Sequence, residues 1–174
     1  MSGIKTTGTV LDKIVASKAS QIKQLQLKYP PADILTDLAP STRSLYDALR
    51  EGPASFILEC KKASPSKGLI REQFDLPLIT SAYKNYASAI SVLTDEQYFQ
   101  GDFEYVKQVR GLLEQPIICK DFFVEPYQIH LARYMGADAI LLMLSVLDDE
   151  QYIKLARVAQ QYAMDVLTEV SNHQ

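Results

Sequence analysis

The sequence predicts an α/β fold of the (β/α)8-barrel type, truncated after about the fifth strand and preceded by a helical extension. From residue 53 onward, short β-like runs alternate with amphipathic helix-like stretches, which indicates right-handed crossovers and a parallel sheet. The runs recur about every 25 to 30 residues, a spacing that suits a barrel of roughly 250 residues. Charged residues also stand at the predicted carboxyl ends of the strands, where barrels of this type gather their active sites.

The N-terminal residues 1–52 are predicted to form the helical extension. Hydrophobic residues at helix-like spacing predict a helix over residues 10–28, and Tyr29-Pro30-Pro31 ends it because proline lacks the amide hydrogen and clashes with the preceding turn. A second short helix is predicted over residues 44–50. Gly52-Pro53 then marks the boundary to the barrel segment, residues 53–174.

The barrel segment is predicted to contain five strands, over residues 56–61, 89–94, 116–120, 137–143 and 165–170. Four helices lie between them, over residues 76–87, 103–114, 126–135 and 149–163. Tyr83 and Tyr86 are expected to pack the first of these helices against the sheet. An open doubly wound sheet is the alternative, but residues 63–68 (ASPSKG) stand where such a fold carries a glycine fingerprint.

Five strands cannot close a barrel that needs eight. We therefore expect the first and fifth strands to be open edges, which invite pairing with another chain. We also expect the residues meant for the barrel interior to lie exposed, with Ile57, Val92, Ile118 and Leu141 as the candidates.

Composition and charge exclude several classes of protein. The 174 residues are 47% hydrophobic and 22% charged, as in globular domains. A net charge of −3 without a basic block longer than Lys61-Lys62 argues against nucleic-acid binding. The first residues lack the apolar core of a signal peptide, and the longest apolar run, residues 139–144, is far shorter than the roughly 20 residues that span a membrane. We expect a cytoplasmic protein with no nucleic-acid or membrane partner.

A metal site and a disulfide are not expected. Cys60 and Cys119 each lie in an apolar β-like run, which is typical of reduced packing residues. His130 and His173 are too few for a typical zinc site. His130 also lies among apolar neighbours on a predicted helix, where a structural role is expected.

Four charged residues at strand ends form the candidate catalytic cluster. Because side chains alternate along a strand, Glu59 and Lys61 share one face while Cys60 points to the other. Lys120 and Glu169 end the third and fifth strands. The simplest geometry directs all four into the barrel mouth, where mixed charges pair around a ligand. Each of these residues, taken alone, is equally well explained as a side chain at a strand end that reaches solvent. Acids and bases without a nucleophilic serine or cysteine suit proton transfer on an anionic substrate.

Two kinds of loop residue are candidate ligand contacts. Residues 64–68 offer hydroxyls, a lysine and backbone donors for a phosphate, although an ordinary turn is the simpler interpretation. The aromatic pairs Tyr98-Phe99 and Phe122-Phe123 follow the second and third strands. They suit the walls of a ring-binding pocket, or else they only pack their own loops.

These same segments resemble the motifs of the indole-3-glycerol-phosphate synthase family. The run ILECKKASPSKG at residues 57–68 resembles the family's first-strand signature, which is its most specific motif. SVLTDEQYFQG at residues 91–101 resembles the second strand and its loop. CKDF at residues 119–122 and GADAILL at residues 136–142 are similar to the third and fourth strands. The similarity extends over nearly the whole chain.

The resemblance implies a (β/α)8-barrel lyase of tryptophan biosynthesis with an N-terminal helical segment and neither a metal nor an organic cofactor. Members of the family convert 1-(2-carboxyphenylamino)-1-deoxyribulose 5-phosphate, a phosphorylated aromatic substrate, into indole-3-glycerol phosphate. The reaction closes a ring and releases carbon dioxide and water.

The resemblance also implies roles for individual residues. Lys120 matches the general acid that protonates the ketone oxygen during ring closure, and Glu169 matches the general base of the dehydration. Lys61 is implied to pair with the substrate carboxylate and to act as a second acid, and Glu59 to orient the lysines and the substrate hydroxyls. The implied substrate contacts are Ser64 near the phosphate and Phe99, Phe122 and Leu141 around the aromatic ring.

Two departures from the family pattern matter. Glu169 is followed by Val-Ser-Asn172, where many members have a histidine two residues after the glutamate. This ending resembles enterobacterial-type enzymes fused to a phosphoribosylanthranilate isomerase, so we expect a fused isomerase domain beyond residue 174. The chain also stops before the sixth, seventh and eighth strands, which carry further active-site residues of the family. We therefore expect residues 1–174 alone to lack synthase activity and to self-associate or stay partly molten.

Two other functions stay open at this point. One is an aldolase barrel in which Lys120 or Lys61 forms a Schiff base with a ketone substrate. The other is a catalytically inactive half-barrel that only binds a ligand or a partner.

Overall fold

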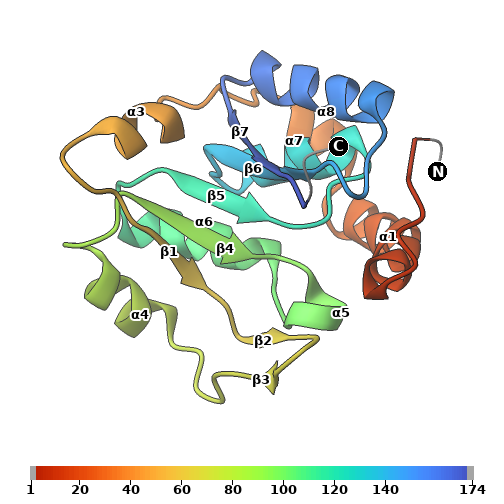
Figure 1. The fold of residues 1–174 in the computed structure, drawn as a ribbon. Helices are drawn as coiled ribbons and strands as arrows, with labels where there is room; N and C mark the ends of the chain where they lie inside the picture. The colour runs from red at the N-terminus through yellow and green to blue at the C-terminus, as the bar shows by residue number, and fades with distance from the viewer. Residues whose placement is uncertain (1–2, 172–174) are drawn as a thin grey trace.

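The structure of the chain is a computed structural model that describes residues 3–171, and its centre is a parallel sheet of five strands (Figure 1). The strands are β1 (Ile57–Cys60), β4 (Ala89–Leu93), β5 (Ile117–Lys120), β6 (Ala139–Met143) and β7 (Asp165–Glu169). They stand in the order β1-β4-β5-β6-β7, so each strand pairs with the next one along the chain. A doubly wound sheet reverses its strand order near the first strand. The continuous order therefore confirms the barrel-type winding and excludes the doubly wound alternative.

Four helices fill the crossovers and cover one face of the sheet: α4 (Leu76–Tyr83), α6 (Phe103–Leu112), α7 (Pro126–Tyr134) and α8 (Asp149–Gln161). Three of them begin at an aspartate whose carboxylate accepts a hydrogen bond from a backbone amide of the first turn: Asp75, Asp102 and Asp148. The face of the sheet beneath the helices is apolar and includes Cys60 and Cys119, which are buried free thiols. The prediction that the cysteines pack against the helix layer is confirmed.

The N-terminal segment forms three helices: α1 (Val10–Lys28), α2 (Pro31–Leu35) and α3 (Leu45–Arg50). The predictions for α1 and α3 are confirmed, whereas α2 was not predicted. Pro31 stands in the first turn of α2, where no amide hydrogen is needed. The Pro30-Pro31 pair that ends α1 therefore also begins the next helix. Buried residues of α1 and α2, among them Ile22 and Ile34, belong to the same hydrophobic core as the sheet.

The short helix α3 covers the other face of the sheet at the amino ends of the strands. Its Leu45 packs with Ala89, Ile118 and Ala139 in a small separate cluster. This contact buries Ile118, and Leu141, which lines a pocket with Phe99 and Phe122, is buried too, so the expectation that these two barrel-facing residues lie exposed was wrong. Val92 is buried too, but it faces the helix layer, so its assignment to the barrel interior was wrong. Ile57 on the edge strand β1 is 38% exposed, as expected.

The loops contain further short elements that the sequence did not predict. The segment expected to be an ordinary turn is an antiparallel hairpin of β2 (Ala63–Ser64) and β3 (Gly68–Leu69), and one helical turn, α5 (Glu96–Phe99), follows β4. Gly101, after α5, passes so close to β4 that an added Cβ would lie 2.4 Å from the Leu93 carbonyl oxygen. Tyr86 is 74% exposed because α4 ends at Tyr83, so its predicted packing role was wrong.

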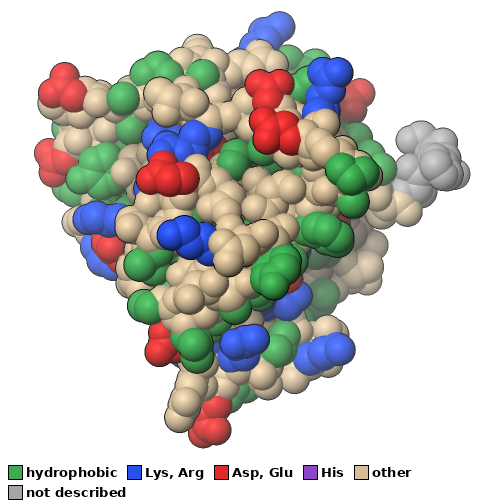
Figure 2. All heavy atoms as spheres, turned by 90° about the vertical axis from the view of Figure 1, so that its left-hand side faces the viewer, with side chains coloured by type: hydrophobic (Ala, Val, Ile, Leu, Met, Phe, Trp, Pro, Cys, Tyr) green, Lys and Arg blue, Asp and Glu red, His purple; other side chains and the backbone are tan. Residues whose placement is uncertain are grey.

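The surface mixes charges of both signs with single hydrophobic side chains. Figure 2 shows this on the side of the molecule where α3 and α4 lie. None of the helices within residues 3–171 is both long and apolar enough to cross a membrane. Asn172, named above in the motif after Glu169, and His173, one of the two histidines considered for a zinc site, lie outside the described residues.

Candidate functional site

Three of the four predicted charged residues form one ion-paired group at the carboxyl ends of the strands. Glu59 on β1 is the centre of this group. Its Oε2 accepts a hydrogen bond from Lys120 Nζ at 2.7 Å, and its Oε1 lies 2.5 Å from Lys61 Nζ. Lys120 reaches Glu59 across β4, because β4 stands between β1 and β5 in the sheet. The group therefore joins side chains that are far apart in the sequence.

The two lysines keep Glu59 ionised. Burial of the Glu59 carboxyl raises its pKa, but the hydrogen bonds and charges of Lys120 and Lys61 outweigh burial, and the pKa lies below its usual value. All three side chains are only partly buried, with exposed fractions of 26% for Glu59, 33% for Lys61 and 36% for Lys120. The lysine ammonium groups can therefore meet a ligand without leaving the carboxylate that orients them.

A pocket of about 190 Å³ adjoins Lys120. Phe99 and Phe122 form part of its wall, with ring centroids 6.2 Å apart and planes inclined by 39°. The other lining residues come from the strand ends β4 to β7 and the residue after β5: Leu93, Asp121, Leu141, Met143 and Glu169. Five of the predicted site residues thus meet in one small, mainly apolar pocket. A pocket of this shape fits one aromatic ring with a polar group at its rim.

Glu169 differs from the other three charged residues. It lines the pocket with Lys120 but has no side-chain hydrogen bond or ion pair within the described part of the chain. Its side chain is exposed at the end of β7, the edge strand of the sheet. The expected mutual pairing of all four charges is therefore found for three of them, and the carboxylate of Glu169 stands apart.

Ser64 lies outside the residues that line this pocket. It is half-buried in β2, and its Oγ accepts a hydrogen bond from the backbone amide of Lys67 at 3.3 Å. Phe123 and Tyr98 also lie outside the pocket, and Phe123 belongs to the hydrophobic core. A larger groove of about 790 Å³ runs along α8, but no strand-end residue lines it.

A second charged group beside the pocket was missed by the sequence analysis. Lys18 of α1 is 2% exposed, and its Nζ forms ion pairs with Asp95, at 2.6 Å, and with Asp121. Although burial lowers the pKa of Lys18, the charges of Asp121 and Asp95 raise it above its usual value. The sequence did hold a signal, because Lys18 interrupts the apolar stripe of α1 midway between Ile14 and Ile22.

The chemistry available at the site is acid–base chemistry. The ammonium group of Lys120 and the separate carboxylate of Glu169 line a mainly apolar pocket, and a second ammonium group, that of Lys61, is paired with Glu59 beside Lys120. The cysteines lie on the opposite face of the sheet. Burial raises the pKa of the Cys60 thiol to about 12, so this thiol is not a thiolate nucleophile. Residues 3–171 contain no group of three or more histidine, cysteine or carboxylate side chains placed to hold a metal ion.

Comparison with known proteins shows one family. The sequence pattern of the family described as Indole-3-glycerol phosphate synthase matches residues 11–174. The Tryptophan biosynthesis protein TrpCF of Salmonella typhi is 58% identical over 164 residues, which cover 94% of this chain and 36% of that protein. The protein of the same name from Vibrio cholerae serotype O1 is 60% identical over 165 residues, covering 95% and 35%. The chain therefore spans about a third of the length of the curated relatives that it matches.

Proposed function

Since the chain belongs to the indole-3-glycerol phosphate synthase family, we propose that the whole protein catalyses the synthase reaction of tryptophan biosynthesis. The substrate is 1-(2-carboxyphenylamino)-1-deoxyribulose 5-phosphate. Ring closure, loss of carbon dioxide and loss of water convert it into indole-3-glycerol phosphate. The relatives named for tryptophan biosynthesis support this assignment.

The observation that carries the proposal is the position of Lys120. Its ammonium group is held by Glu59 at 2.7 Å and stands at the rim of a pocket walled by Phe99 and Phe122. An aryl ring in this pocket places the substrate ketone next to the ammonium group. A hydrogen-bonded ammonium can donate a proton to a carbonyl oxygen as charge develops on it.

Ring closure is proposed to proceed with Lys120 as the general acid. The aromatic carbon that carries the carboxylate attacks the ketone carbon, and Lys120 protonates the ketone oxygen as the carbon–carbon bond forms. Lys61 pairs with the substrate carboxylate until carbon dioxide leaves. Glu59 holds both lysines, because each of its carboxylate oxygens contacts one ammonium group.

The dehydration that follows needs a base, and Glu169 is proposed for this role. Its carboxylate lines the same pocket as Lys120 and is not neutralised by a lysine or arginine within residues 3–171. A carboxylate without a cationic partner is free to accept a proton from the ring carbon or nitrogen, while Lys61, as the second acid, protonates the hydroxyl group so that it leaves as water. Ser64 is proposed to contact the substrate phosphate from the β2–β3 hairpin.

The remaining features of the whole protein are proposed from the family and the relatives. The reaction needs no metal or organic cofactor, and the protein acts in the cytoplasm. The relatives are about three times as long as this chain, which supports a fused phosphoribosylanthranilate isomerase domain beyond residue 174. The division into a helical extension, residues 1–52, and a barrel segment, residues 53–174, is proposed on the same basis.

A Schiff-base aldolase is the second candidate, and the ion pairs disfavour it. A Schiff base needs a free amine as the nucleophile. Lys120 and Lys61 are both held in ion pairs by the Glu59 carboxylate, and either lysine would have to leave that pair to attack a carbonyl carbon.

One experiment separates the two reactions. The full-length protein is incubated with the substrate, and release of carbon dioxide and formation of indole-3-glycerol phosphate are followed. A parallel sample receives borohydride. The proposed function predicts product formation and no covalent adduct after borohydride treatment. A borohydride-trapped adduct on Lys120 or Lys61 with no indole product would establish the aldolase instead.

A further inference from the structure

We propose that Lys18, on the N-terminal helix α1, is a positioning residue that sets the gap between the two aromatic walls of the pocket. The proposal rests on the proposed function for the identity of the ring that enters the gap. Lys18 does not line the pocket itself. It acts through the two aspartates that it joins, each of which belongs to the loop of one aromatic wall.

Asp95 controls the loop of Phe99. It immediately precedes α5, the single helical turn that ends at Phe99, and its Oδ1 accepts a hydrogen bond from the Tyr98 amide at 2.7 Å. Its carbonyl oxygen accepts another from the Gly101 amide at 2.8 Å, so Asp95 holds both ends of the turn. Its Oδ2 is the atom that contacts Lys18 Nζ.

Asp121 controls the second wall in the same way. It lies between Lys120 and Phe122, and its Oδ1 accepts a hydrogen bond from the Phe122 amide at 2.7 Å and contacts Lys18 Nζ. Its Oδ2 accepts a hydrogen bond from the hydroxyl of Thr94 at 2.8 Å. Lys18 Nζ also lies 5.9 Å from the centroid of the Phe122 ring, within the range of a cation–π contact.

The ammonium group of Lys18 therefore joins the two loops through ion pairs to one aspartate of each. Asp95 and Asp121 are fully buried, and two buried carboxylates repel each other unless a cation lies between them. Without Lys18 the loops that carry Phe99 and Phe122 would move apart or take up water. The gap between the rings, now 6.2 Å between centroids, would change with them.

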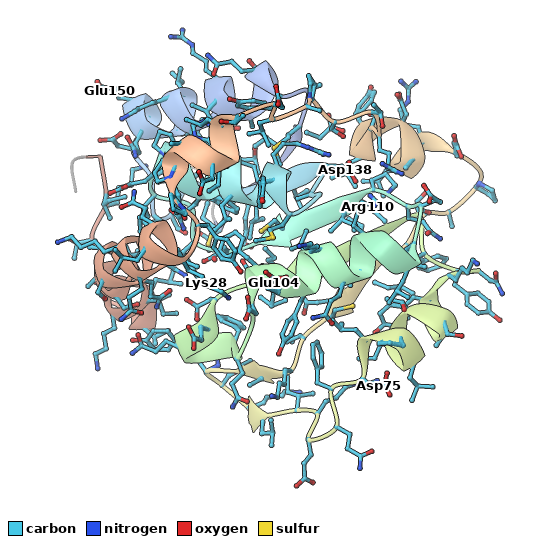
Figure 3. All side chains as sticks on the ribbon, turned by 180° about the vertical axis from the view of Figure 1, so that it is seen from behind. Lys28, Asp75, Glu104, Arg110, Asp138 and Glu150 are labelled. Atoms are coloured by element: carbon cyan, nitrogen blue, oxygen red, sulfur yellow. The ribbon has the colours of Figure 1, made fainter. Side chains whose placement is uncertain are left out.

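The helix that carries Lys18 is fixed to the barrel at a second, independent point. The hydroxyl of Tyr29, just after α1, donates a hydrogen bond to Glu104 of α6 at 2.6 Å. In Figure 3, Lys28 and Glu104 lie close together at this contact. Neither Tyr29 nor Glu104 lines the pocket. Loss of this contact therefore loosens α1 without touching either aromatic loop, which makes Tyr29→Phe a matched control.

The test uses the full-length protein and two variants of Lys18. Lys18→Met removes the cation. Because this variant leaves two buried carboxylates unpaired, which destabilises the fold, a double variant of Lys18→Met with Asp95→Asn is also made. The double variant has the same net charge as the native group. The probe is 2-aminobenzoate, the aryl part of the substrate, titrated by its fluorescence. We expect its dissociation constant to rise by about fivefold or more in both variants, the worth of one aromatic contact, and to stay within about twofold in Tyr29→Phe.

Steady-state kinetics give the second readout. The KM of the substrate should rise with the dissociation constant of 2-aminobenzoate, while the inhibition constant of inorganic phosphate stays unchanged because phosphate does not use the aromatic walls. Three results would overturn the proposal. They are equal affinity of the native protein and the charge-matched variant for 2-aminobenzoate, no binding of 2-aminobenzoate to either protein, and a loss of affinity in Tyr29→Phe as large as that in the Lys18 variants. If the native protein binds 2-aminobenzoate as expected but makes no indole product, the proposed function fails and the role of Lys18 stands.

Discussion

At the scale of single residues, Glu59 determines how the charged end of the sheet is arranged. It is one carboxylate between two lysines, and its lowered pKa follows from those two contacts despite partial burial. Lys120, which lines the pocket, and Lys61 are both held by Glu59 without being neutralised completely, since two ammonium groups share one carboxylate. Glu169 has no such partner among the described residues, and this difference separates a proposed acid from a proposed base at the same pocket.

Replacement of Glu169 tests this difference. Glu169→Gln keeps the shape of the side chain and removes the basic carboxylate, so we expect turnover of the full-length protein to fall by about 10²–10⁴-fold, the usual worth of a general base. Product affinity and the unfolding curve should be unchanged, because glutamine keeps the shape of the side chain and Glu169 makes no side-chain hydrogen bond or ion pair within the described residues. The measurements are kcat, product binding and circular dichroism. Full activity with normal product binding would remove Glu169 from the base role.

The charged part of the candidate site was largely predictable from the sequence because its residues lie in strands or directly follow one. Alternation along β1 fixes that Glu59 and Lys61 share a face once the strand is recognised, and the strand ends of a parallel sheet meet at one edge. Lys18 could not be placed in this way, since its partners Asp95 and Asp121 are about 80 to 100 residues away and belong to other elements. A lysine in an apolar stripe predicts a buried partner of opposite charge, but the pattern does not identify which residue that partner is.

At the scale of elements, the N-terminal helices bind the sheet at both ends. Lys18 of α1 reaches the carboxyl ends of β4 and β5. At the amino ends, Ser41 from the segment before α3 donates a hydrogen bond to Asp138 at 2.7 Å. Arg110 of α6 points toward the same carboxylate at 2.7 Å, as Figure 3 shows, and Arg133 of α7 lies 3.2 Å from it. One fully buried carboxylate thus connects the extension, two helices and β6.

Removal of the Asp138 charge should lower the stability of the fold more than it changes the candidate functional site. Asp138→Asn leaves two guanidinium groups without their carboxylate, so we expect the free energy of unfolding to fall by about 3 kcal/mol. Urea unfolding of the full-length protein, followed by circular dichroism, measures the change. The control is Glu114→Gln, which removes the exposed Arg43–Glu114 pair and should leave the curve unchanged. A shift as small as that of the control would show that Asp138 is not the connection described here.

The helices and strands were predictable because their hydrophobic periodicity is strong, and the short elements were not. All five strands and the six longer helices appear where the spacing of apolar residues places them. The elements α2, α5 and the β2–β3 hairpin each have five residues or fewer per segment, too few to show a period. The helix α3 packs against the face of the sheet opposite the helix layer, and its Leu45 helps to bury Ile118. No local sequence pattern contains this tertiary contact.

At the scale of the whole molecule, the sheet has two edge strands that pair on one side only within residues 3–171. β1 and β7 are the outer strands, and exposed hydrophobic residues lie on or beside both, with Phe56 and Ile57 at one edge and Leu167 and Val170 at the other. Unpaired strand edges offer backbone donors and acceptors to another strand, and apolar side chains beside them strengthen such pairing. The short helix α3 covers the interior face at the amino ends of the strands.

These edges predict the behaviour of residues 1–174 as an isolated chain. We expect it to have no synthase activity and to self-associate, because each open edge can pair with another copy. Size-exclusion chromatography at several concentrations, together with an activity assay, measures both properties. The expected profile is a concentration-dependent shift to larger species. A well-folded monomer that turns over the substrate would contradict this prediction.

The most direct test of the central claim is the turnover of Lys120→Met in the full-length protein. The 2.7 Å contact with Glu59 places Lys120 at the rim of the aromatic pocket, and Lys120 is the proposed donor of the proton that ring closure requires. We predict that kcat falls by about 10²–10⁴-fold, while substrate affinity changes much less because the aromatic walls remain. A kcat within a few-fold of the native value would contradict the assignment of Lys120 as the acid.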